Sequence, residues 1–289
     1  MLGKIIRYEF KSTARLFLLM YAALIVMAAI NMLIIPWNED VTAVSANPVL
    51  DATRGIFNGL FIVMYILLAV ATAVVTTVII VIRFYRLLGD QGYLWFTLPV
   101  TTNQHILAKL IAGIVWSVAS FVAIVLSLLV LFARLNYFDA IADVWQRVTA
   151  IGFNLPGWIA VMLLSMLVGA VSNILVFYAS ISLGPHITKS RLGGSVIAYI
   201  IAYVIMQIVA TVASLITFSA ASRVDYELEA MESMPPDAQV SDAFTAGFIE
   251  TLDQVGAVSF GIGLATSVIF AVAGYIITHR MLTKKLNLA

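Results

Sequence analysis

The sequence predicts an all-α membrane protein with about six transmembrane helices and both termini in the cytosol. Of its 289 residues, 62% are hydrophobic and only 11% are charged, and the mean hydropathy is +1.04. A soluble domain usually carries about 25% charged residues. The apolar residues form continuous runs, which suit helices in hydrocarbon and differ from the alternating pattern of a membrane barrel.

Six apolar runs are each long enough to cross a bilayer, and we expect each to form a transmembrane helix. The first run is about 20 residues long, which exceeds a typical signal-peptide core, so we expect it to remain as an uncleaved span. The runs lie at Leu16–Ile35, Asn58–Ile82, Ile106–Ala133, Pro156–Leu183, Gly193–Ser219 and Val255–Thr278.

The basic residues fall mostly on one side of these spans. The segments on the other side contain only four basic residues, Arg54, Arg134, Arg147 and Arg223. Basic residues favour the cytoplasmic side, so the sequence predicts a multi-pass membrane protein with cytosolic ends. We expect the plasma membrane as its location. The basic residues of the predicted cytosolic side are Lys4, Arg7, Lys11, Arg15, Arg83, Arg86, Lys109, Lys189, Arg191, Arg280, Lys284 and Lys285.

Residues 1–15 are predicted to form an amphipathic helix that lies in the inner membrane interface. At 100° per residue, one face carries Lys4, Arg7, Lys11 and Arg15, and the opposite face carries Leu2, Ile5, Ile6 and Phe10. Glu9 falls among the apolar residues, where a carboxylate needs a partner. Arg83 and Arg86, at the end of the second span, are the candidates; the alternative is that Glu9 reaches water at the helix edge.

Residues 83–105, between spans two and three, are unusually aromatic for a short connection. Pro99 ends any helix there, and Thr101 or Thr102 can cap the next one. We therefore expect a short helix, a turn and then span three. The aromatic residues are explained either by anchoring at the membrane interface or by docking of a cytosolic partner.

Residues 220–254 form the longest polar segment, and it is acidic. We expect a solvated extracytoplasmic loop with one or two short helices, divided by Pro235-Pro236. The alternative is a cap over an exit path or a ligand-binding element.

Two stretches resemble the ABC-2 type transporter permeases. Gly89-Asp90-Gln91-Gly92, then Leu98-Pro99-Val100-Thr101, then Lys109, is similar to the cytosolic loop of that family. There an acidic residue and a glycine precede a Leu-Pro element, and a lysine opens the third span. Ile6–Lys11 looks like the family's amphipathic N-terminal helix. The chain departs from the family where many members have Glu-Gly, because Gln91-Gly92 stands there.

The resemblance implies a single permease domain over residues 1–289 that serves as the membrane subunit of an ATP-driven exporter. Its partners would be an identical or related permease chain, the lipid membrane, and cytosolic ATPase subunits that hold ATP and Mg. Its cargo would be a peptide, a drug or a lipid-like molecule. The cytosolic loop would contain a coupling helix that docks on the ATPase through Leu87, Gly89, Asp90, Gly92, Tyr93, Leu94, Trp95, Phe96, Leu98 and Pro99.

Several kinds of chemistry are missing from the sequence. The only Gly-Lys pair is Gly3-Lys4, so no phosphate-binding loop of the GxxxxGK[ST] type is present. There is no cysteine, which excludes thiolate sites. We expect no metal or other cofactor on this chain and no catalytic role, and the net charge of +1 gives no indication of nucleic-acid binding.

Apart from Lys109, the predicted spans contain no charged residue. Asn173 and Gln207, in spans four and five, are the notable polar residues, which we expect either to bond each other across the helices or to contact a substrate. Proton- and sodium-coupled transporters usually bury ionisable groups at this depth. A channel or secondary transporter without an ATPase, and a membrane sensor or scaffold, remain the alternative functions.

Overall fold

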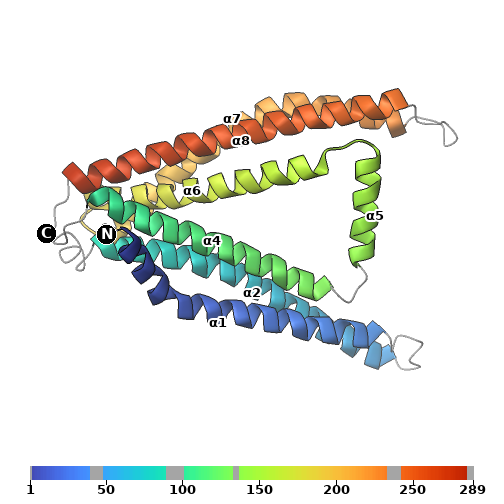
Figure 1. The fold of residues 1–289 in the computed structure, drawn as a ribbon, viewed down its shortest axis with the longest axis horizontal. Helices are drawn as coiled ribbons and strands as arrows, with labels where there is room; N and C mark the ends of the chain where they lie inside the picture. The colour runs from blue at the N-terminus through green and yellow to red at the C-terminus, as the bar shows by residue number, and fades with distance from the viewer. Residues whose placement is uncertain (1, 40–47, 89–100, 133–136, 233–241, 285–289) are drawn as a thin grey trace. The chain divides into compact units, whose positions relative to one another are not determined.

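The computed structural model describes residues 2–39, 48–88, 101–132, 137–232 and 242–284. Within these ranges the secondary structure is entirely helical (Figure 1). The helices are α1 (Leu2–Glu39), α2 (Pro48–Leu88), α4 (Thr102–Phe132), α5 (Tyr137–Ala150), α6 (Leu155–Ile187), α7 (Arg191–Glu232) and α8 (Asp242–Lys284).

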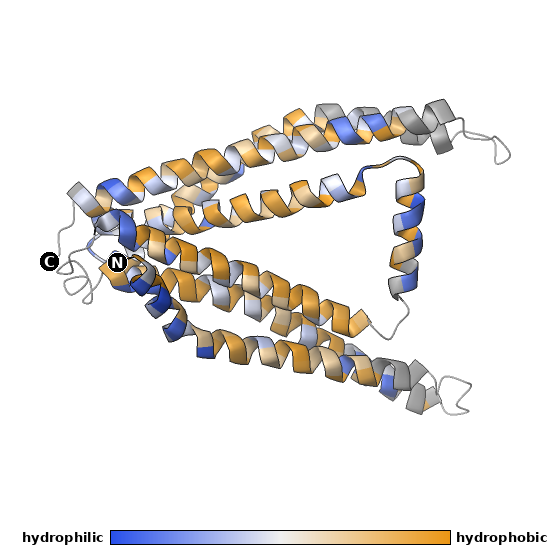
Figure 2. Cartoon of the chain, viewed as in Figure 1, coloured by the Kyte–Doolittle hydropathy of each residue, from blue (hydrophilic) through white to orange (hydrophobic). Residues whose placement is uncertain are grey.

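Six of the described helices, all except α5, are long and apolar enough to cross a membrane. Each contains one of the six predicted apolar runs, except that Ala133 of the third run lies outside the described residues. This confirms the predicted number of spans. Figure 2 shows apolar residues over the long helices, with hydrophilic residues gathered mainly toward their ends. The predicted orientation of the termini stays a prediction, because length and composition do not fix which side faces the cytosol.

The acidic segment 220–254 differs from the expected loop with separate short helices. The transmembrane helices continue into it, so that α7 ends at Glu232 and α8 begins at Asp242. With 42 and 43 residues, these helices are each about 63–65 Å long, against about 30 Å of hydrocarbon. Residues 220–232 contain no Gly or Pro and are rich in Ala and Glu, which favours continuation of the helix.

The chain divides into two compact units of helices, and the expected single permease domain stays a prediction. The first unit contains α1, α2 and α4, the second contains α6, α7 and α8, and the boundary falls within α5 between Asp143 and Val144. In the first unit, α1 packs against both α2 and α4. Its core contains Leu24, Ala28 and Tyr65.

Hydrogen bonds between helices add to the apolar packing of the first unit. The Tyr21 hydroxyl on α1 lies 2.8 Å from the Ser120 hydroxyl on α4, which in turn lies 2.7 Å from the Thr76 hydroxyl on α2. The Tyr65 and Ser127 hydroxyls, on α2 and α4, are also 2.8 Å apart. These bonds join three helices at positions where lipid offers no hydrogen-bonding partner.

In the second unit, α6 packs against α7 and α8. At Gly274 on α8, an added Cβ would lie 2.9 Å from the backbone of Leu175 on α6, so the two helices approach closely because residue 274 has no side chain. The indole Nε1 of Trp158 on α6 donates to the carboxylate of Asp253 on α8 at 2.6 Å. Gly256 on α8 leaves space for the Trp158 ring, with which an added Cβ would clash.

Candidate functional site

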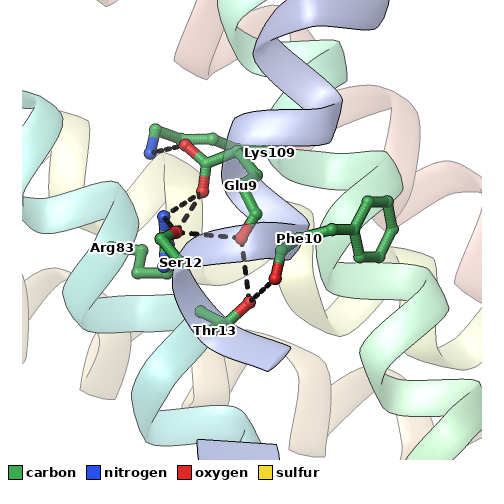
Figure 3. Close-up of polar contacts among 6 residues, drawn as sticks. All are labelled: Glu9, Phe10, Ser12, Thr13, Arg83 and Lys109. Atoms are coloured by element: carbon green, nitrogen blue, oxygen red, sulfur yellow. Dashed lines mark hydrogen bonds and ion pairs between the residues drawn. The ribbon is translucent and has the colours of Figure 1, made fainter. Parts of the chain in front are cut away.

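Glu9, Arg83 and Lys109 form a buried charged cluster that joins the three helices of the first unit; we call it the Glu9 cluster (Figure 3). The carboxylate oxygen Oε2 of Glu9 accepts from Arg83 Nε at 2.8 Å and lies 2.6 Å from Arg83 Nη2 in an ion pair. The other oxygen, Oε1, accepts from Lys109 Nζ at 2.9 Å. Both carboxylate oxygens therefore have a cationic donor.

The three side chains of the Glu9 cluster are shielded from water to different degrees. The Glu9 side chain is 3% exposed, Lys109 is 9% exposed and Arg83 is 25% exposed. A buried ion pair stabilises only when its geometry satisfies the charged atoms, whereas an uncompensated charge at such a site is strongly destabilising. One carboxylate faces two cations here, so the cluster carries a net charge of +1, and Arg83 is the member with most access to water.

Ser12 and Thr13, which follow Glu9 on α1, add hydrogen bonds around the cluster. The Ser12 hydroxyl donates to the Glu9 carbonyl oxygen at 3.0 Å and accepts from Arg83 Nη2 at 2.6 Å. The Thr13 hydroxyl also donates to the Glu9 carbonyl, at 2.9 Å. Figure 3 shows Ser12 and Thr13 one turn along α1 from Glu9. Arg83 thus contacts two positions of α1, which fixes its side chain against that helix.

An aromatic contact lies beside the cluster. Phe10 lies 5.7 Å from Trp116 between ring centroids, and Phe17 stacks on Trp116 at 4.2 Å. Aromatic pairs at such separations contribute about 0.5–1.5 kcal/mol beyond their buried area. The first turns of α1 are therefore attached to α4 by both charge and packing.

The position of the cluster relates it to residues 89–100. Arg83 lies five residues before the last residue of α2, and Lys109 lies seven residues after the first residue of α4. Both helices that flank this segment are thus bonded to the same carboxylate of α1. Leu87 is buried at the end of α2. The remaining predicted docking residues, Gly89, Asp90, Gly92, Tyr93, Leu94, Trp95, Phe96, Leu98 and Pro99, lie outside the described residues.

The prediction that Glu9 pairs with an arginine at the end of span two is confirmed for Arg83, and Arg86 is exposed. Sequence reasoning missed Lys109 as the second partner, because it was counted only as one of the basic residues that set the cytosolic side. Its position inside a long apolar run was the available signal. Lys4, Arg7, Lys11 and Arg15 are exposed, and Phe10 is partly buried. Residues 2–15 form the beginning of the continuous helix α1, and their location in the membrane interface stays a prediction.

Asn173 and Gln207 do not meet in this structure. Both side chains are exposed, and no hydrogen bond joins them. Across the described helices, no group of three or more His, Cys, Asp or Glu side chains is arranged to hold a metal ion. The Glu9 cluster is therefore the concentration of buried charge from which a function can be argued.

The chain was compared with known protein families, characterised proteins and solved structures. No match was found. The interpretation of the site consequently depends on its geometry and on the resemblance of its motifs.

Proposed function

We propose that this chain is the membrane subunit of an ATP-driven exporter whose ATPase is a separate cytosolic subunit. The observation that carries the proposal is that Glu9 of α1 bonds to the end of α2 and to the beginning of α4. These are the two helices that flank residues 89–100, the segment that resembles the ATPase-contacting loop of ABC-2 permeases.

The geometry supplies a path for mechanical coupling in the proposed exporter. When the ATPase subunits close on ATP, the docked loop is displaced together with the adjoining ends of α2 and α4. Arg83 and Lys109 both bond to Glu9, so α1 moves with them instead of slipping past. The docked state must bind one conformation of the membrane helices more tightly than the other, since a partner without differential affinity shifts no equilibrium.

In the proposed exporter, ATP binding and membrane transport belong to different subunits. Its sequence has no phosphate-binding loop of the usual type, so ATP and Mg belong to the partner in this proposal. The permease partner is an identical or related chain, and the exported substrate belongs to the peptide, drug or lipid-like classes.

Affinity purification of the tagged full-length chain from native membranes in mild detergent tests the proposal. We expect a subunit with a phosphate-binding loop to co-purify. Replacing Leu94, Trp95 and Phe96 with Ser should remove that subunit, because the docking surface is lost. The matched control replaces Ile141, Val144 and Trp145 of α5, which are exposed, with Ser, and should leave the complex intact.

Two results would overturn the proposal. One is the absence of any nucleotide-hydrolysing subunit from the purified complex. The other is movement of solute across proteoliposomes that contain this chain alone, which would favour a channel or secondary transporter. A complex that survives the change at Leu94, Trp95 and Phe96 would instead refute the assignment of the docking loop.

A further inference from the structure

Four basic residues form an exposed stripe at the start of α1. Lys4, Arg7, Lys11 and Arg15 are all exposed, and at 3.6 residues per turn they fall within an arc of about 80°. Tyr8 flanks this arc, about 20° beyond Arg15, and is 57% exposed. None of the four basic side chains forms an ion pair with another residue in the described part of the chain. We call these four residues the basic stripe.

The rest of α1 shows what surrounds this face. Beyond Arg15, Leu18 and Leu33 continue the same helical face, and Leu19 and Val26 lie beside it. These four side chains are 57–67% exposed. Exposed aliphatic side chains in a predicted span face hydrocarbon. The face changes from basic to apolar between Arg15 and Leu18, so this is where the hydrocarbon ends.

Helix geometry keeps the stripe near that boundary. Lys4 and Arg15 are about 16 Å apart along the helix axis, whereas each polar layer of a bilayer is only about 5–8 Å thick. A straight helix along the membrane normal would carry Lys4 beyond the headgroups. Figure 1 shows that the dark-blue beginning of α1 runs at an angle to the rest of the helix, which shortens its rise along the main axis.

The Glu9 cluster fixes the rotation of this segment. Glu9 lies away from the stripe on the helix circumference, and its bonds to Arg83 and Lys109 hold that side of α1 against α2 and α4. The stripe consequently points away from both helices. Its exposure is set by buried contacts on the other side and not by a freely rotating terminus.

We propose that the basic stripe is a binding site for anionic phospholipid headgroups. Four cations without an acidic partner among the described residues complement a phosphate-rich surface, and the apolar continuation of the same face accommodates the acyl chains. Tyr8 supplies an amphipathic ring at headgroup depth. The proposal does not depend on an ATPase partner, so it stands or falls separately from the proposed function.

The test uses the purified full-length chain in a neutral detergent, titrated with dioctanoyl-phosphatidylglycerol or dioctanoyl-phosphatidylcholine. Thermal unfolding is the readout, because a ligand that binds the folded state raises its midpoint. We expect phosphatidylglycerol to raise the midpoint and phosphatidylcholine to leave it unchanged. High salt should abolish the difference, since salt screens exposed charges.

The stripe variant replaces Lys4, Arg7, Lys11 and Arg15 with Gln. Each basic residue near an anionic surface contributes about fivefold in affinity, so the apparent affinity for phosphatidylglycerol should fall at least about 10-fold. A variant that exchanges Lys for Arg and Arg for Lys at these positions should retain binding. If the Gln variant does not fold, this charge-conserving variant still tests whether positive charge at these positions is sufficient for binding.

A matched variant neutralises four other exposed basic residues, Arg86, Arg147, Lys189 and Arg280, and should retain most of the binding. Equal losses in the two neutralised variants would overturn the stripe as a site and indicate an effect of net charge. An equal response to both lipids would also overturn it, and would indicate that the stripe faces an acidic protein surface or water.

Discussion

Replacing Glu9 with Gln should destabilise the first unit by about 3–5 kcal/mol. At an effective dielectric constant of 20, each ion pair of Glu9 is worth about 4 kcal/mol at a charge separation of 4 Å. Repulsion between the two cations and the desolvation of all three groups offset much of that sum. The substitution removes both attractions and leaves Arg83 and Lys109 with their mutual repulsion, which is why the net loss is large for an isosteric change.

The second variant in the series adds Lys109→Met to Glu9→Gln. Lys109 is 9% exposed and Arg83 is 25% exposed, so Arg83 has the easier path to water once the carboxylate is gone. Removing the more deeply buried cation should therefore recover stability, and the double variant should lose only about 1–2 kcal/mol relative to the natural chain.

Unfolding of the full chain by sodium dodecyl sulfate in mixed micelles, followed by circular dichroism, measures these free energies. Lys189→Gln serves as the control, because Lys189 is exposed and a surface substitution of this kind costs less than about 0.5 kcal/mol. A loss below about 1 kcal/mol for Glu9→Gln would refute the reasoning. So would a double variant that is less stable than Glu9→Gln alone.

Three further substitutions test the packing of the two units in the same assay. Gly274→Leu should cost about 1–3 kcal/mol because it separates α6 from α8, whereas Gly261→Leu, where an added Cβ meets nothing within 4 Å, should cost almost nothing; equal losses would contradict the close approach. Trp158→Phe should cost about 1.5–3 kcal/mol through its bond to a carboxylate, and Trp145→Phe should be neutral. Tyr21→Phe should cost about 0.6 kcal/mol by losing an interhelical bond, and an unchanged stability would rule out that bond.

The spans were predictable because they depend on composition over about 20 residues, which a single sequence gives directly. The pairing of Glu9 was predictable for a different reason: a carboxylate on an apolar helical face conflicts with its surroundings, so a partner is required. Lys109 shows the limit of such reasoning. A lysine near the start of a span can extend to water or turn inward, and only the packing of α1 against α4 decides between them.

Helices that are apolar on every side give little information about rotation. Asn173 and Gln207 lie in two such helices, α6 and α7, so the sequence could not predict that both side chains would be exposed. The short helix α5 was missed despite a usable signal, because Ile141, Val144 and Trp145 repeat at helical spacing. The proposed coupling path involves only the first unit, where Glu9 forms ion pairs with Arg83 and Lys109.

The most direct test of the proposed coupling is a cysteine cross-link between position 95 and the ATPase subunit, measured in native membranes. The chain contains no cysteine, so Trp95→Cys introduces a single reactive thiol. We expect a covalent adduct with a subunit that carries a phosphate-binding loop, and we expect its yield to change when ATP is added. An adduct that forms only with other membrane proteins, or none at a thiol that reacts freely with a soluble reagent, would contradict the account.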